Sequence, residues 1–204
     1  MPVSDRLRGS PALASDRRQP AGPATEETAV VEQQEASEDA VMTRIGQAIM
    51  LLHGGDREEA RNRFGALWSE LGADGDALHR CTLAHYMADT QDDPGDELAW
   101  DLRALTAAEA LRTGEGPGGG DGPGAAGGGG GGPGAEHRDT PAVRAFYPSL
   151  HLNLAADYLK LQRPDSARVH LQRARAAAES LADDGYGGGV RAAIDRLELR
   201  LREQ

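Results

Sequence analysis

The sequence predicts an all-α fold, and three observations lead to this prediction. Apolar residues recur at intervals of three and four along successive segments of the chain. Ala, Leu, Arg, Glu and Gln, which favour helices, dominate outside one Gly-rich tract, whereas β-branched residues are scarce. Short stretches rich in Gly, Asp or Pro, which end helices, separate the periodic segments. A chain of 204 residues has room for one such domain together with unstructured parts.

The N-terminal region precedes the predicted helices. Residues 1–36 begin with a non-periodic mixture of Pro, Ser, Gly, Arg and Asp and then become acidic, and we expect them to be disordered. Ser37, followed by Glu38 and Asp39, resembles a helix N-cap with acidic residues in the first turn. The folded domain is therefore predicted to begin near Ser37.

Four helices in two pairs are predicted for residues 37–113. The first carries apolar residues at helical spacing from Val41 to Leu52, and Gly54 and Gly55 end it. Asp56 is the expected N-cap of the second helix. The other two helices are expected over residues 77–90 and 96–111, separated by an acidic turn that contains a proline.

A Gly-rich tract, residues 114–139, separates these four helices from three more. Gly maximises the entropy cost of ordering, so the tract is predicted to be a flexible insertion. Thr140 and Pro141 have the residue types of an N-cap and a first helical position. Residues 140–204 are therefore predicted to hold a third helix pair and a final helix. The strongest periodicity in this region covers residues 149–161, 165–181 and 190–202.

Small residues recur at fixed positions of two of these helix pairs. Ala155 is followed twelve residues later by Ala167, and Ala48 is followed twelve residues later by Ala60. This pattern, with a Gly-Asp turn in the first pair, resembles the tetratricopeptide repeat, in which small residues allow the two helices of a repeat to approach closely. The resemblance implies a superhelix of three antiparallel helix pairs with a C-terminal capping helix.

The middle pair departs from this pattern. Ala84 and Ala99, the candidates for its small positions, are fifteen residues apart. Arg103 and Thr106 stand where apolar residues are expected after Ala99. The register of the second repeat stays open, and another helical hairpin fold is the alternative.

The resemblance implies that the first helix of each pair lines a concave face that holds a peptide or a helix. Counting from the small positions places eleven candidate partner-binding residues on this face: Ile45, Ile49, Leu52, His53, Cys81, His85, Asp89, Leu152, Ala156, Leu159 and Lys160. Most of them are apolar, so the expected function is a non-catalytic interaction scaffold that binds an unidentified protein or peptide in an apolar groove. The alternative is a structural homo-oligomer that pairs through the same face.

One further alternative places chemistry on the third helix. Cys81, His85 and Asp89 are spaced by four and share a helix face. With His151 they could ligate zinc, and Cys81 with His85 could form a nucleophile–base pair. The sequence lacks both the tight Cys/His pairs of structural zinc sites and an oxyanion-hole motif. A metal-binding or hydrolytic protein is therefore the lesser hypothesis, and we expect no enzyme activity, cofactor or metal.

The charge balance bears on the class of partner. The net charge is −11, and the isoelectric point is near 5.0. This charge disfavours non-specific binding to nucleic acids and to anionic membranes, both of which require Lys and Arg. The single cysteine, the absence of an apolar N-terminal segment and the absence of a membrane-length apolar run lead us to expect a cytoplasmic protein.

Overall fold

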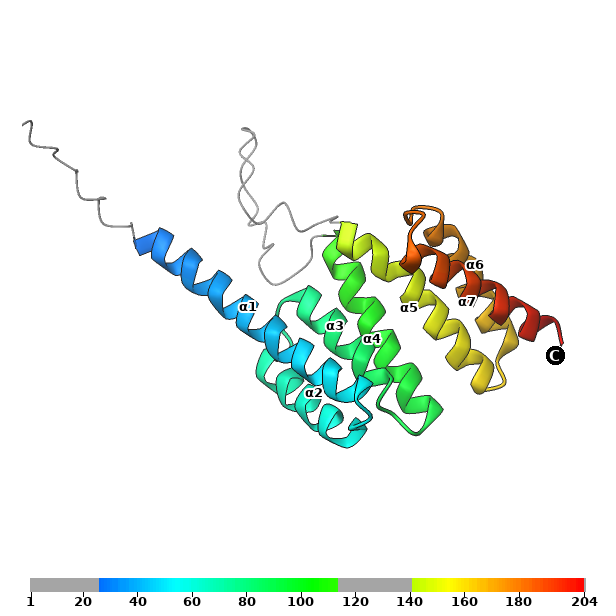
Figure 1. The fold of residues 1–204 in the computed structure, drawn as a ribbon, viewed down its shortest axis with the longest axis horizontal. Helices are drawn as coiled ribbons and strands as arrows, with labels where there is room; N and C mark the ends of the chain where they lie inside the picture. The colour runs from blue at the N-terminus through cyan, green and yellow to red at the C-terminus, as the bar shows by residue number, and fades with distance from the viewer. Residues whose placement is uncertain (1–25, 114–140, 204) are drawn as a thin grey trace, which may run out of the picture. The chain divides into compact units, whose positions relative to one another are not determined.

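The computed structural model of the protein describes residues 26–113 and 141–203. These residues form seven helices and no strand, so the all-α prediction is confirmed for them (Figure 1). The helices are α1 (Glu26–His53), α2 (Arg57–Leu71), α3 (Ala77–Ala88), α4 (Pro94–Thr113), α5 (Pro141–Lys160), α6 (Pro164–Ala178) and α7 (Gly185–Arg202). The predicted disorder of residues 1–25 and the predicted flexible insertion at 114–139 lie outside the described residues.

The chain divides into two compact units, Met1–Ser37 and Glu38–Gln204. In the first unit, residues 26–36 are helical, so the expectation that they are disordered is wrong. Ser37 lies inside α1 and is not an N-cap. The reason is local: residues 26–45 contain no Gly or Pro and are rich in Ala, Glu and Gln, and each residue added to an existing helix adds a hydrogen bond.

In the second unit, consecutive helices pack against one another in chain order. The packed pairs are α2 with α3, α3 with α4, α4 with α5, α5 with α6, and α6 with α7 (Figure 1). Helix α5 also contacts α7. The core consists of three clusters of buried side chains, contributed by α1, α2 and α3, by α3, α4 and α5, and by α5, α6 and α7. Helices α3 and α5 each belong to two clusters and thereby link one helix pair to the next.

The small residues singled out in the sequence at the proposed helix contacts are buried, except Ala99. Ala48, Ala60, Ala84, Ala155 and Ala167 are each 0% exposed. Ala155 and Ala167, from α5 and α6, belong to the same buried cluster. A larger side chain at either position would collide with its neighbours, because protein interiors are close-packed.

Aspartates determine where several helices begin. The Asp56 side chain accepts a hydrogen bond from the Glu59 backbone N–H, so the predicted cap of α2 is confirmed. Asp184 caps α7 in the same way, because its side chain accepts from the Gly187 backbone N–H. Helix α7 therefore begins at Gly185, five residues before Val190, where the sequence predicted its start. The Gly-rich stretch after Asp184 is therefore helical, although Gly disfavours helices, because the cap satisfies a backbone donor of the first turn.

The start of α4 determines the helical frame of the second helix of the middle pair. The Asp93 side chain accepts hydrogen bonds from the backbone N–H groups of Gly95 and Asp96, and the helix begins at Pro94. Counted from the first residue of α2 and α6, the two buried alanines Ala60 and Ala167 are both in fourth place. The fourth residue of α4 is Glu97, and Ala99 is half-buried. Ala99, the sixth residue of α4, therefore does not take the place that the buried alanines hold in α2 and α6.

Candidate functional site

Three of the eleven predicted partner-binding residues are inaccessible. Ile45, Cys81 and Leu159 are 0%, 1% and 2% exposed, and each belongs to a core cluster. Their assignment to a partner-binding face is wrong. Counting along one helix does not distinguish a groove-facing stripe from the adjacent stripe that a neighbouring helix covers.

The other eight residues are at least partly accessible, but the apolar ones among them mostly extend the core. Ile49 and Leu52 pack against the cluster of α1, α2 and α3, whereas Leu152 and Ala156 pack against the cluster of α5, α6 and α7. The most exposed of the eight are polar: His53, Asp89 and Lys160. His85 is half-buried. The accessible surface is thus polar and aromatic rather than an apolar groove.

A row of side-chain contacts connects the odd-numbered helices of the second unit. The His53 and Tyr86 rings join α1 to α3 with centroids 6.4 Å apart, and the His85 and Phe146 rings join α3 to α5 at 6.2 Å. We call the surface formed by this row the odd-helix face. Its residues are His53, His85, Tyr86, Phe146, Ser149, Asn153 and Tyr186.

Two hydrogen bonds complete the odd-helix face. Asn153 Nδ2 lies 3.5 Å from His85 Nδ1, and the hydroxyls of Ser149 and Tyr186 lie 2.6 Å apart, which joins α5 to α7. Every residue of the face is half-buried or exposed. Sequence reasoning missed Tyr86, Phe146, Ser149, Asn153 and Tyr186. Aromatic residues are only 4% of the chain, but they also occur on α2 and α4, so their placement in the sequence does not single out this face.

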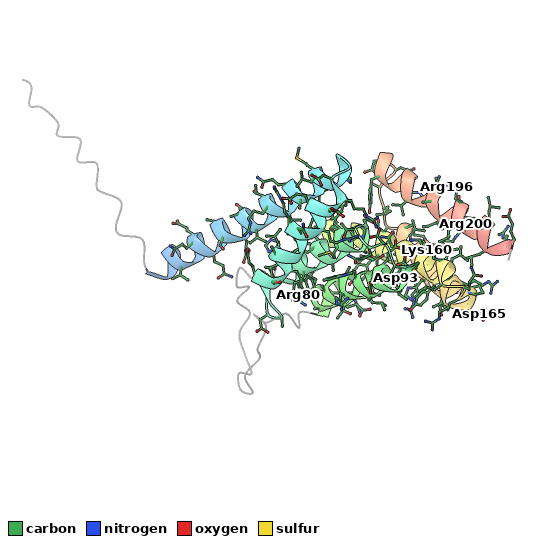
Figure 2. All side chains as sticks on the ribbon, turned by 90° about the horizontal axis from the view of Figure 1, so that it is seen from below. Arg80, Asp93, Lys160, Asp165, Arg196 and Arg200 are labelled. Carbon is green, nitrogen blue, oxygen red and sulfur yellow. The ribbon has the colours of Figure 1, made fainter. Side chains whose placement is uncertain are left out.

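A polar cluster lies where α3, α4 and α5 meet. Lys160, which ends α5 and is labelled in Figure 2, donates to Glu97 Oε1 at 2.5 Å and to Asp157 Oδ1 at 3.4 Å. His85 Nδ1 is 3.7 Å from Asp101 Oδ1. The cluster therefore adjoins the odd-helix face through His85.

Two carboxyl groups of this cluster are almost completely buried. Asp101 and Asp157 are each 1% exposed, and Asp101 Oδ1 and Asp157 Oδ2 have no hydrogen-bond partner. Burial raises the pKa of Asp157 to about 8, and the charge and hydrogen bonding of Asp101 act in the same direction. Loss of hydration also raises the pKa of Asp89, and the positive charge of His85 opposes this change.

The environment of Cys81 does not favour the nucleophile hypothesis. Burial, assisted by the negative charge of Asp101, raises the pKa of the Cys81 thiol to about 12. The thiolate is the nucleophilic form, and reactive cysteines have lowered pKa values. In the residues that the structure describes, no group of three or more His, Cys, Asp or Glu side chains is arranged to hold a metal ion.

His151, proposed as a fourth zinc ligand, contacts α6 instead. Its Nδ1 atom lies 3.2 Å from Nδ1 of His170. Burial, assisted by the charges of His170 and Arg173, lowers the pKa of His151 to about 4. Two neutral imidazoles can share a hydrogen bond, so the pair is explained by packing of α5 on α6.

A surface hollow between α6 and α7 is lined mainly by charged groups that already bind one another. Arg175 Nη2 is 2.9 Å from Asp195 Oδ1, and Arg191 Nη2 is 2.6 Å from Asp183 Oδ1. These exposed ion pairs need no ligand to balance them, so we place the candidate site on the odd-helix face.

Two further findings bear on the class of protein. Within residues 26–113 and 141–203, no helix combines the length and the apolar character needed to span a membrane. No protein-family model, curated protein or solved structure matches this chain significantly.

Proposed function

We propose that this chain is a tetratricopeptide-like repeat protein that acts as a non-catalytic interaction scaffold, with the odd-helix face as the binding surface for a peptide or helix of a partner protein. The observation that carries the proposal is the continuous row of accessible imidazole, aromatic and amide groups across α1, α3, α5 and α7. The succession of helix pairs supports it, together with the buried alanines of the first pair, Ala48 and Ala60, and of the third pair, Ala155 and Ala167.

The chemistry of the face indicates how a partner would bind. Aromatic rings supply contact area at a low cost in side-chain entropy, and Asn153 and the histidines can bond to backbone amides. Asp89, exposed next to His85, adds a negative charge to this end of the face. The partner segment is therefore proposed to present apolar side chains together with a basic residue, rather than the purely apolar helix expected from the sequence.

The test uses substitutions that are matched by helix. His53→Glu on α1 and Tyr186→Ala on α7 alter the odd-helix face, whereas Met50→Glu and Leu199→Glu alter exposed positions of the same two helices. Immobilised native protein and the two double variants are compared for proteins captured from lysate, after circular dichroism has shown equal helix content. Loss of a captured protein with the face variant alone supports the proposal. Identical capture by both double variants contradicts it.

The homo-oligomer hypothesis remains a separate prediction. Light scattering over a wide concentration range measures the mass directly. A monomer at high concentration contradicts self-association. A dimer that the His53/Tyr186 double variant converts to a monomer would instead assign the odd-helix face to a second copy of this chain.

A further inference from the structure

Asp101 occupies a core position that is apolar in the other helix pairs. Counted from the first residue of α2, α4 and α6, the eighth residues are Phe64, Asp101 and Leu171. All three are buried, at 0%, 1% and 6% exposure. The helical frame therefore places a carboxyl group where the first and third pairs place a large apolar side chain.

Asp157 of α5 occupies the position that corresponds to Tyr86 of α3. The buried alanines Ala84 of α3 and Ala155 of α5 are each followed two residues later by a residue that packs against the preceding helix pair. That residue is Tyr86 in α3 and Asp157 in α5. At the first junction, between α2 and α3, the Phe64 and Tyr86 rings stack with centroids 6.3 Å apart and an interplanar angle of 20°. At the second junction, between α4 and α5, the equivalent positions hold Asp101 and Asp157.

Asp101 and Asp157 are buried and act on each other electrostatically, and two such groups are not stable when both carry a charge. Removing two like charges from water costs several kcal/mol per ion, and their mutual repulsion adds to this cost. Asp101 Oδ1 and Asp157 Oδ2 both lack a partner, which also costs free energy when both groups are acceptors only. One proton removes both costs, because a protonated carboxyl donates to the oxygen of the other carboxylate in a short charge-assisted hydrogen bond.

The charged and titratable groups around Asp101 and Asp157 do not supply enough positive charge to balance two carboxylates. Lys160 lies 3.4 Å from Asp157 Oδ1, but it also binds Glu97, and the pair thus shares one cation with a third carboxylate. From α3, His85 Nδ1 is 3.7 Å from Asp101 Oδ1. Cys81 on α3 and Asp89, the residue that follows α3, add no positive charge.

We propose that Asp101 and Asp157 share a single proton, and that this carboxyl–carboxylate hydrogen bond fastens the second helix pair to the third, so that loss of the proton at alkaline pH loosens the junction. His85 and Asn153 meet across the same junction, so loosening would separate the α3 part of the odd-helix face from the α5 part.

The electrostatics of the pair support this proposal and set the sign of the pH effect. The pKa of Asp157 rises in the folded protein from its ordinary value of 3.8 to about 8. The folded state therefore retains a proton that the unfolded chain has already released. The contribution of this proton to stability is therefore complete below pH 3.8, the ordinary pKa, and is lost as the pH rises towards 8.

The first experiment follows the aspartate carboxyl carbons of the full-length native protein by NMR from pH 3 to pH 9. Two coupled signals are expected, with one midpoint above pH 6, whereas an ordinary aspartate titrates near pH 4. Titration of every folded-state aspartate below pH 5 would overturn the proposal. This measurement requires no variant.

The second experiment measures urea unfolding between pH 7 and pH 9, an interval that includes the pKa of about 8 given for Asp157. Asp157→Asn and Asp101→Asn each retain a side chain that can donate a hydrogen bond without a titrating proton. We expect both to lose most of the decrease in stability that the native protein shows. Asp165→Asn, at an exposed carboxyl paired with Arg168, is the control and should keep the native slope. Equal slopes in all four proteins would contradict a shared proton.

Removal of both titrating groups at nearly constant volume provides a third check. Asp101→Asn combined with Asp157→Asn keeps two hydrogen-bonding side chains at the junction and leaves no carboxyl group there. The double variant is expected to fold and to show no decrease in stability between pH 7 and pH 9. A folded double variant with the native pH dependence would show that the proton belongs to another group.

Discussion

Enlarging Ala167 tests the role assigned to the small residues at the helix crossings. Ala167 of α6 is 0% exposed and shares a buried cluster with Ala155 of α5. Helices α5 and α6 pack extensively. Ala167→Leu adds three carbon atoms on the buried face, where the structure leaves no exposed surface to receive them. Either the side chain adopts a strained rotamer or the two helices move apart.

The expected loss follows from the cost of overpacking. Extra methylene groups in a packed core cost about 1–3 kcal/mol. For a domain of this size, each kcal/mol lowers the melting temperature by about 2–4 °C, so the expected decrease is about 2–12 °C. Burial of the added carbon atoms offsets part of this cost only if the neighbours can move to accommodate them.

The assay is thermal and urea unfolding followed by circular dichroism. Ala176, exposed on the same helix, supplies the matched control. Ala176→Leu adds the same atoms at the surface and should change the free energy of unfolding by less than about 0.5 kcal/mol. If Ala167→Leu is as stable as the native protein, the helices do not meet closely at this position, and the tetratricopeptide-like proposal loses its main structural support.

Three further predictions concern single positions. Asp93→Ala removes the cap that accepts from two backbone N–H groups at the start of α4, and denaturant unfolding should show a loss of about 0.5–2 kcal/mol. Gly187→Ala should lower the melting temperature, because its Cβ would lie 2.2 Å from the Ala182 carbonyl oxygen, whereas Gly188→Ala meets no atom within 4 Å and should raise it. A higher melting temperature for Gly187→Ala would contradict the close approach. Because the fold lowers the pKa of His151 to about 4, it excludes a proton that the unfolded chain binds, so stability should fall as the pH decreases from about 6.5 to 4. His151→Gln should reduce that fall, and an unchanged profile would locate the effect elsewhere.

Local signals in the sequence were sufficient for the helical class and for part of the packing. Asp56 caps α2 as predicted, because a cap needs only the residues of its own first turn. Ala48, Ala60, Ala155 and Ala167 were identified from spacing alone and are completely buried. Spacing is informative here because the helical period is constant, so residues that share a face remain at fixed intervals.

The sequence analysis was wrong where two local signals conflicted and where burial depends on a neighbouring helix. Ser37 has the residue type of a cap, but the surrounding sequence favours helix on both sides of it, and α1 continues through. Ile45, Cys81 and Leu159 were placed on the concave partner-binding face, yet other helices cover them. A helix has a single periodicity, and only the arrangement of its neighbours decides which side of an apolar stripe is covered.

The pair Asp101 and Asp157 shows most clearly what only the tertiary structure decides. By itself the sequence determined that α4 and α5 are helices, but neither aspartate differs there from an ordinary surface residue. Their burial depends on the start of α4 at Pro94, which sets the helical frame, and on the packing of α5 against that frame. These residues, 56 positions apart in the chain, are both buried by the packing of α4 and α5, and the loss of hydration raises the pKa of Asp157.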